Sequence, residues 1–405
     1  MSNKKELKIL AIETSCDDTA IAVLKAQNHK LEVLSSLVSS QVMLHKRYGG
    51  IYPMLAKREH QNNLTFVLKK VLKKAGLLKN KKKINSLDKS SIDKFKKILI
   101  REQRLFDDLI LFFKNYQKPD IDLIAVTNGP GLEPCLWVGI NFAKALSFFW
   151  KIAIIPVNHI EAHIFSAIVD LEKKFKVDNL KNIFPAVCLI VSGGHTQLIL
   201  MEKIGKYKIL GETRDDAAGE CFDKTARILK LDYPGGPVIS KKADQWKKDK
   251  KNLVDIKLPR PMINTKDYDF SFSGLKTAVL YNVKNQSNRM IKNKAYIRKM
   301  CYEIQEAVVD VLVKKTFKAA NDYMVKTIIL GGGVVANKGL RKRFIELGRL
   351  GKEKFNILIA PKNLCTDNAI MVGIAAYFNE FVKKRKIKGI KNWKNIKANA
   401  NLKLK

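Results

Sequence analysis

The sequence has few cysteines and no long apolar segment, and both absences exclude classes of protein. None of its six cysteines belongs to a CxxC pair, which excludes a zinc ribbon or a CxxC redox motif and fits a chain with reduced thiols. The longest apolar stretch, 142–157, is interrupted by Lys144 and Lys151 and is shorter than the roughly 20 residues of a membrane span. Acidic residues near the N-terminus interrupt any signal-peptide core. We therefore expect a cytoplasmic protein without a membrane partner.

Acidic residues are scarce relative to basic ones. The 76 Lys and Arg residues outnumber the 38 Asp and Glu residues, which gives a net charge of +38. Such an excess favours association with a polyanion, most simply a nucleic acid. The alternative is a biased composition in which lysine fills solvated positions, and the charge alone leaves both readings open.

Two stretches hold much of the positive charge. Residues 79–118 carry twelve Lys or Arg against five Asp or Glu, and residues 383–405 carry ten against none. We interpret 79–118 as a basic insertion that is partly helical from 92 to 114. We interpret 383–405 as a solvated basic tail.

The apolar pattern predicts a duplicated fold, for which 405 residues are long enough. Residues 7–25 and 186–202 each predict a strand, a polar turn and a second strand. Strands then alternate with helices in both halves, which indicates an α/β protein of two lobes. We place the first lobe at 1–169, a charged connector at 170–182 and the second lobe at 183–382.

Two glycine clusters follow apolar strands in the second half. They are SGGH at 192–195 and GGGVVAN at 331–337. Glycine lets backbone N–H groups approach a phosphate closely, although each cluster could also be a tight turn without a ligand. Neither cluster has the GxxxxGK[ST] or GxGxxG spacing. Two clusters in corresponding places favour a bound nucleotide over two unrelated turns.

The motif VNHIEAHI contains two of the six histidines, His159 and His163, four residues apart. At that spacing they share one face of a helix. Asn158 is a suitable N-cap and Glu161 completes a capping box, so Glu161 need not be a catalytic base. The pair is either a metal site or ordinary helix surface. A metal site needs a third ligand, and Asp367 is a candidate whose alternative role is to cap the last helix.

Two further aspartates stand out. Asp223 lies in the middle of a predicted helix, where aspartate has poor propensity, so it is either exposed or recruited for binding. Asp17 lies in the ETSCDDT turn. It either stabilises that turn or lies where an actin-like nucleotide fold keeps an acid near phosphate.

Nine motifs together resemble one family, the tRNA adenosine threonylcarbamoyltransferases, once labelled O-sialoglycoprotein endopeptidases. The motifs are IETSCDDTAIAV, YGGIYPMLAKREH, NGPGLEPCLWVGINFAKAL, VNHIEAH, LIVSGGHTQL, DDAAGECFDKTARILKLDYPGGP, FSFSGLKTAV, GGGVVAN and CTDNAIM. They span most of residues 8–378 in the family's order. The sixth motif favours the bacterial and organellar branch.

The resemblance implies an actin-like, Hsp70-like α/β fold of two lobes with an interlobe nucleotide cleft. It implies transfer of the threonylcarbamoyl group from threonylcarbamoyl-AMP to N6 of the adenosine 3′ of the anticodon, with release of AMP. The implied substrates are tRNAs that read codons beginning with A. The implied helpers are an inactive paralogue and a P-loop ATPase.

The resemblance also assigns site residues. One divalent metal ion, Fe²⁺, corresponds to His159, His163 and Asp367. Asp17 matches a residue of the family's active-site turn and is a candidate general base. The residues that correspond to the family's adenylate site are Ile190, Val191, Ser192, Gly193, Gly194, Asp223, Gly236 and Asn337.

The chain departs from the family pattern in a few places. Ala162 replaces the usual glycine, and Pro134 and Cys135 replace Gly-Ser after GPGL, so the conformation of that loop is not carried over. The insertion at 79–118 and the tail at 383–405 exceed the usual pattern. We predict that both add electrostatic affinity for tRNA.

Three other functions are compatible with parts of this pattern. A metalloprotease, the older family label, needs a water-activating carboxylate beside the metal. A non-catalytic actin-like scaffold partner would lack the metal histidines, which this chain retains. A sugar kinase of the same fold would not need the metal triad.

Overall fold

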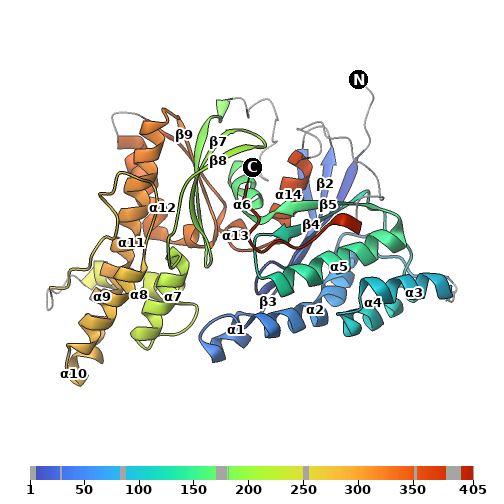
Figure 1. Cartoon of the computed structure of the whole chain (residues 1–405), viewed down its shortest axis with the longest axis horizontal. Coiled ribbons are helices and arrows are strands. Elements are labelled where there is room, and N and C mark those ends of the chain that lie inside the picture. The colour runs from blue at the N-terminus through green and yellow to red at the C-terminus, as the bar shows by residue number, and fades with distance from the viewer. Residues whose placement is uncertain are drawn as a thin grey trace. The chain divides into compact units, whose positions relative to one another are not determined.

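The computed structural model describes residues 6–27, 30–82, 88–169, 180, 182–249, 255–350, 354–379 and 394–404. The chain forms two compact units, and Figure 1 labels most of their helices and strands. The first unit comprises Met1–Met43, Ile51–Leu180 and Asp367–Leu404, and the second comprises Leu44–Gly50 and Lys181–Thr366. Most of the predicted connector and the start of the predicted tail lie outside the described residues.

The first unit is built on one mixed sheet. Its elements are β1 (Leu7–Glu13), β2 (Asp18–Gln27), β3 (Lys30–Ser40), α2 (Pro53–Lys74), α3 (Lys89–Ile98), α4 (Gln103–Asn115), β4 (Leu123–Gly129), α5 (Glu133–Trp150), β5 (Ala153–Asn158), α6 (His159–Ile168) and α14 (Ala369–Tyr377). The strand order is β3-β2-β1-β4-β5. β1 pairs antiparallel with β2 and parallel with β4, and β4 pairs parallel with β5. The carboxyl ends of β1, β4 and β5 therefore share one edge of the sheet.

The second unit repeats this arrangement. Its elements are β6 (Ala186–Val191), β7 (Thr196–Lys203), β8 (Lys206–Glu212), α7 (Ala218–Ile228), α8 (Gly235–Asp249), α9 (Ser273–Lys284), α10 (Asn288–Ile291), α11 (Lys294–Asp322), β9 (Thr327–Gly331), η3 (Gly333–Ala336), α12 (Lys338–Leu350), β10 (Asn356–Ile359) and α13 (Lys362–Cys365). The strand order is β10-β9-β6-β7-β8. The short α1 (Val42–His45) and η1 (Lys46–Tyr48) lie where the chain first passes to this unit.

The two sheets match strand for strand. β6 pairs antiparallel with β7 and parallel with β9, as β1 pairs with β2 and with β4. β8 and β10 occupy the two edges that β3 and β5 occupy in the first sheet. The predicted duplication is thus confirmed. The third strand of each antiparallel half, β3 and β8, was not predicted from the sequence.

Helices cover both faces of the first sheet, which explains its apolar strands. Leu10 and Ile12 of β1 pack in one buried cluster with Leu68 of α2. A β-carbon on Gly373 of α14 would lie 2.4 Å from the Leu24 side chain of β2. Because this glycine has no side chain, α14 can lie directly on the face of the sheet opposite α2. Because α14 belongs to the first unit, the second unit ends before the predicted residue 382.

The predicted insertion at 79–118 contributes to the core of the first unit. Its two helices, α3 and α4, confirm the predicted helical content. Phe95 and Phe113 are buried, and the Phe113 ring stacks on Phe149 of α5 with 4.0 Å between centroids. The lysines of α3 face outward, as Lys96 and Lys97 are exposed. The basic composition therefore belongs to the outer face of a packed helical layer.

Within residues 394–404, the prediction of a solvated tail is wrong at Ile396, while the lysines of this segment are exposed as predicted. Ile396 is only 8% exposed and packs into the core of the first unit. The backbone N–H of Asn399 donates to the carbonyl of Asn128 at 2.9 Å. Alternation hides this packing in the sequence, because Lys394 and Lys397 are exposed on either side of Ile396.

Among the helices that the structure describes, none combines the length and the apolarity needed to cross a membrane.

Candidate metal centre

The helix that carries both histidines begins at the carboxyl end of β5. The side-chain oxygen of Asn158 accepts from the N–H groups of Ile160 at 2.9 Å and Glu161 at 3.2 Å. This confirms the predicted N-cap and fixes His159 as the first residue of α6. The Glu161 carboxylate accepts from the Asn379 amide at 2.7 Å. It is buried in this contact with the C-terminal side of α14, so Glu161 does not supply the base that a metalloprotease would need.

Three predicted ligands converge in the first unit. Oδ1 of Asp367 lies 3.5 Å from Nε2 of His159 and 3.3 Å from Nε2 of His163. The two imidazole centroids are 4.6 Å apart, and the rings are nearly perpendicular. His159, His163 and Asp367 each offer one ligand atom, and these atoms lie within 4.8 Å of one another. Asn368, and not Asp367, caps α14, so the alternative role of Asp367 is taken by its neighbour.

Glu13 supports the first histidine and was missed from the sequence. Its side chain is fully buried at the end of β1. One oxygen accepts from the Ser15 N–H at 2.6 Å, and the other from the Thr127 hydroxyl at 2.7 Å. The second oxygen also lies 3.1 Å from Nδ1 of His159. A proton on Nδ1 would leave Nε2 of His159 as a ligand, the arrangement of many metal-binding histidines.

The charges of the cluster are strongly coupled. Burial alone would lower the pKa of His159, but the carboxylates of Asp367 and Glu13 outweigh it and raise this pKa to about 9. Burial holds the pKa of His163 below its ordinary value. Burial would raise the pKa of Glu13, but the neighbouring His159 lowers it. In the metal-free protein, a positive charge on His159 therefore offsets one of the two negative charges of Glu13 and Asp367.

The donor set fits a divalent cation. His163 is fully buried, and neither of its ring nitrogens has a hydrogen bond in the described structure. A buried polar atom without a partner is costly, and a metal ion facing Nε2 would satisfy it. Two imidazoles and one carboxylate leave coordination positions open, as in the non-heme Fe(II) oxygenases.

The ETSCDDT turn lies beside this cluster, and α2 fixes it in place. His60 of α2 is fully buried, with Nδ1 2.7 Å from the Thr19 hydroxyl and Nε2 3.0 Å from the Cys16 carbonyl. Because a carbonyl only accepts, Nε2 carries the proton. Asp17 lies in this turn, and its carbonyl accepts from the Gln41 N–H at 3.2 Å. The structure thus places Asp17 in the same unit as the metal candidates.

Replacing Asp18 with asparagine is expected to stabilise the protein above neutral pH. Oδ1 of Asp18 is buried without a hydrogen bond, and burial raises the pKa of this carboxyl from 3.8 to about 7. The unfolded chain releases this proton near pH 4 and the folded chain only near pH 7, so Asp18 lowers stability as pH rises between those values. A shift of that size corresponds to about 4 kcal/mol, which partial solvent access reduces to about 1–2 kcal/mol.

Urea unfolding at pH 4 and pH 8 measures this effect. The stability gain of Asp18→Asn should be small at pH 4 and reach its full value by pH 8. Asp107→Asn on the exposed face of α4 is the control for loss of one carboxylate. A gain of equal size at both pH values would contradict the assigned titration.

The predicted adenylate residues all lie in the second unit. Ile190 and Val191 end β6, and the SGGH turn follows, closed by a hydrogen bond of 2.8 Å from the Ser192 N–H to the His195 carbonyl. The Cβ positions of Gly193 and Gly194 face open space. These two glycines therefore leave the backbone accessible to a ligand.

The second glycine cluster lies against Val191, the residue just before the first cluster. A β-carbon on Gly332 would lie 2.4 Å from the Val191 carbonyl, and the φ of Gly332 is +95°. Only glycine suits both conditions. The clusters follow β6 and β9, which are adjacent parallel strands, so both reach the same edge of the second sheet, as the sequence predicts.

Two of the remaining three residues, Asp223 and Asn337, each stabilise a helix end. Oδ1 of Asp223 in α7 accepts from the Gly235 N–H at 2.7 Å, which holds the start of α8 next to Gly236. Asn337 accepts from the Leu340 N–H at 3.0 Å at the start of α12, and its amide donates to Gln305 at 2.8 Å. Mid-helix Asp223 thus holds the loop before α8, a structural role that was not among the alternatives from the sequence.

Pro134 and Cys135 fit the helix that follows the GPGL loop. α5 begins at Glu133, so Pro134 lies in its first turn, where a missing N–H is tolerated. Cys135 is fully buried. The departure from the family pattern therefore leaves a regular helix start.

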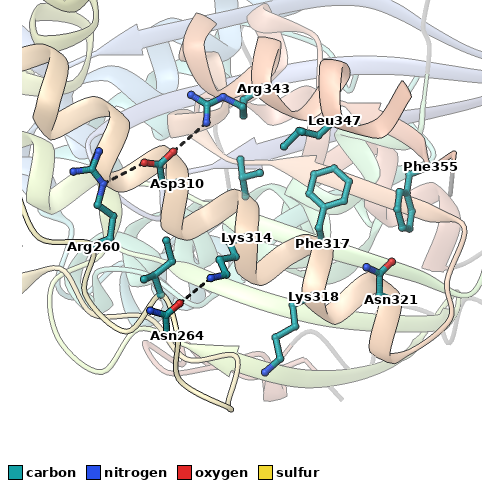
Figure 2. Close-up of a pocket in the computed structure, with 12 residues that line it drawn as sticks. Arg260, Asn264, Asp310, Lys314, Phe317, Lys318, Asn321, Arg343, Leu347 and Phe355 are labelled. Carbon is teal, nitrogen blue, oxygen red and sulfur yellow. Dashed lines mark hydrogen bonds and ion pairs between the residues drawn. The ribbon is translucent and has the colours of Figure 1, made fainter. Parts of the chain in front are cut away.

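The second unit also has a groove of about 1060 Å³ along α11 and α12. Figure 2 shows Asp310 between Arg260 and Arg343, with the rings of Phe317 and Phe355 farther along. The two arginines contact the Asp310 carboxylate at 3.2 and 3.0 Å. The lining includes none of the predicted site residues.

Comparison with known sequences gives one consistent family. A family model described as tRNA N6-adenosine threonylcarbamoyltransferase matches residues 32–84 and 108–374. A protein of that name from Thermosipho africanus is 41% identical over 396 residues, which cover 98% of this chain and 99% of the relative. Another, from Bacillus subtilis, is 40% identical over 375 residues, which cover 93% and 91%. The stretch between the two matched ranges lies inside the predicted insertion.

A solved structure supports the fold. HypF of T. kodakarensis has a TM-score of 0.50 and 12% sequence identity, and the match covers 93% of this chain and 48% of the HypF chain. At that identity the likeness concerns the fold alone. With the two sheets of equal strand order, it confirms the predicted duplicated, actin-like α/β fold.

Proposed function

The chain belongs to the family of tRNA N6-adenosine threonylcarbamoyltransferases, and from this premise we propose its reaction. It transfers the threonylcarbamoyl group from threonylcarbamoyl-AMP to N6 of the adenosine 3′ of the anticodon and releases AMP. Its substrates are tRNAs that read codons beginning with A. The observation that carries the proposal is the convergence of Asp367 with the buried His159 and His163 in a member of a transferase family.

We assign one divalent metal ion, Fe²⁺, to these three side chains. Support comes from Nε2 of His163, which is buried without a hydrogen bond and lies 3.3 Å from Oδ1 of Asp367, and from the open coordination positions that such a set leaves. When bound, the metal supplies Lewis acidity toward a carbonyl or phosphate oxygen. Glu13 holds His159 in the tautomer that presents Nε2.

The rest of the chemistry is assigned to positioning. The exocyclic amine of adenosine is a weak nucleophile, so orientation of the two substrates should contribute much of the acceleration. Ile190–Gly194, with Asp223, Gly236 and Asn337, would hold the adenylate through accessible backbone groups and ordered helix starts. Asp17 is the proposed acceptor of the proton that the amine releases.

The test is a reaction with purified chain, threonylcarbamoyl-AMP and an unmodified tRNA that reads an A-starting codon. AMP release and the modified nucleoside are measured together by chromatography and mass spectrometry. The proposal expects both products in equal amounts, and only when tRNA is present. AMP release without modified tRNA would overturn it.

We propose a cytoplasmic location, and an inactive paralogue and a P-loop ATPase as helpers. The family assignment supports both statements. The reaction above is therefore run with the chain alone and with these two proteins added, and the expected result is a higher rate in the complete mixture.

Replacing Lys96 and Lys97 with glutamine is expected to weaken tRNA binding and its salt dependence. Both side chains are exposed on α3. Each lost phosphate contact should lower the slope of log K against log salt by about 0.7–0.9. Filter binding between 50 and 200 mM salt measures it. The control replaces Lys257 and Lys284, which are exposed in the second unit, with glutamine and so removes the same amount of charge outside the insertion. Equal slopes for the two double variants would contradict a local role for the insertion.

A further inference from the structure

We propose that the C-terminal segment 394–404 is a strap that positions the metal-binding helix α6. The inference rests on the proposed function, because it takes His159 and His163 to be metal ligands. None of the strap residues is assigned to the metal. Their role is to fix the backbone and the cap on which His159 depends, and two separate routes of contact lead from the strap to that histidine.

The first route begins at the loop between β4 and α5. The Asn399 N–H donates to the Asn128 carbonyl at 2.9 Å, and the Gly131 N–H donates to the Ala400 carbonyl at 3.2 Å. A β-carbon on Gly129 would lie 2.0 Å from the Asn399 carbonyl oxygen, and the φ of Gly129 is +148°. The strap thus lies directly against this loop, with no room for a side chain between them.

The other side of the same loop contacts the turn that holds His159. The Leu132 N–H donates to the Ser15 carbonyl at 2.8 Å. A β-carbon on Gly131 would lie 2.6 Å from that carbonyl oxygen. The Ser15 hydroxyl is 3.2 Å from Nδ1 of His159. A shift of the loop would therefore move the group that, with Glu13, orients the imidazole.

The second route runs through the N-cap of α6. The amide nitrogen of Asn158 donates to the Leu402 carbonyl at 3.4 Å. The amide oxygen of the same side chain caps α6 through the N–H groups of Ile160 and Glu161. Because one planar amide makes both sets of contacts, the strap carbonyl helps to select the rotamer that caps the helix.

The strap is anchored by apolar burial. Ile396 is 8% exposed and belongs to the core cluster of the first unit. Lys397 next to it is exposed. Loss of the Ile396 side chain should therefore release the strap, while loss of the Lys397 charge should not.

The experiment measures Co²⁺ affinity of the metal-free protein by titration of its visible absorbance. The variants are a deletion of 394–405, the milder Ile396→Asp in the full chain, and Lys397→Gln as the matched control. We expect roughly tenfold weaker Co²⁺ binding for the first two variants, as for other mutations of residues that orient a metal ligand. We expect no change for the control. Thermal unfolding identifies a variant that has not folded, in which case Ile396→Asp decides the result.

Hydrogen exchange of residues 157–165 in the metal-free protein provides a second readout. We expect faster exchange in both strap variants. A folded strap variant with wild-type Co²⁺ affinity and wild-type exchange would overturn the strap. If the wild-type chain binds no Co²⁺, the metal assignment fails instead, and the exchange rates alone then decide whether the strap orders α6.

A charge variant separates this role from the predicted tRNA contact of the tail. Glutamine at the basic residues of 383–391 leaves the strap sequence intact. It should lower tRNA affinity and leave Co²⁺ affinity unchanged, and the reverse pattern would contradict both assignments.

Discussion

Replacement of His163 with alanine is expected to abolish metal binding and, with it, threonylcarbamoyl transfer. The side chain is fully buried, and its Nε2 faces Asp367 at 3.3 Å. Mutation of a residue that hydrogen-bonds to a metal ligand already lowers metal affinity or activity about 10–100-fold. Loss of a ligand itself should therefore lower both by more than about 100-fold. Excess metal should not restore the rate, because the alanine variant lacks one of three donors.

The same substitution should have little effect on the stability of the metal-free protein. Nδ1 of His163 is buried without a hydrogen bond there, so removal of the ring relieves a penalty of about 1–3 kcal/mol. The cavity left by the ring acts in the opposite direction. A metal-loaded wild type should melt well above the variant, whereas the two metal-free proteins should melt close together.

Ser166→Ala is the matched control on the same helix. Its hydroxyl donates to the His163 carbonyl at 2.8 Å and is fully buried. Removal of this hydrogen bond perturbs α6 without removing a donor from the cluster. Metal content measured by mass spectrometry should match wild type in Ser166→Ala and be absent in His163→Ala. Equal metal content in all three proteins would exclude His163 as a ligand.

The sequence predicts the histidine pair because its information is local. A four-residue spacing and a capping asparagine specify where the helix begins and which face carries the imidazoles. Asp367 is far away in sequence, so the residues alone left it one candidate with an alternative capping role, and the family resemblance assigned it as a ligand. Its physical signal is the neighbour Asn368, which caps α14 and leaves Asp367 available for another role.

Glu13 could not be assigned in this way, because its role depends on strand register. Parallel pairing of β1 with β4 and of β4 with β5 brings Glu13, Thr127 and Asn158 to one edge of the sheet. No motif spacing reports which strands are neighbours. The only local signal was an acidic residue at the end of an otherwise apolar strand.

The missed strands and strap have a different cause. β3 alternates buried and exposed residues only in part, as expected for an edge strand, and one of its serines, Ser35, is buried. In 394–404, three lysines and three asparagines separate the apolar residues. The basic composition thus predicted a solvent-exposed segment. The buried side chain of Ile396 instead packs the segment on the core.

Replacement of Glu13 with glutamine is expected to weaken metal binding by 10–100-fold, the usual effect of changing the group behind a ligating histidine. The carboxylate accepts from three donors, the Ser15 N–H, the Thr127 hydroxyl and Nδ1 of His159. Glutamine keeps the shape but turns one oxygen into a donor. If its oxygen stays on the Ser15 N–H, its amide nitrogen faces His159. Nδ1 must then accept, and the proton moves to Nε2, where it blocks the metal.

Metal titration and steady-state rates measured together distinguish this effect from loss of a ligand. In Glu13→Gln the three donors remain, so saturating metal should restore most of the transfer rate, whereas His163→Ala should stay inactive. Glu32→Gln is the matched control, since this glutamate is 58% exposed in β3 and pairs with Lys25 at 2.9 Å. Such surface pairs contribute about 0–1 kcal/mol, and metal affinity should not change. A Glu13→Gln protein with wild-type affinity would show that the tautomer of His159 is set by another group, for which the Ser15 hydroxyl, 3.2 Å from Nδ1, is the remaining neighbour.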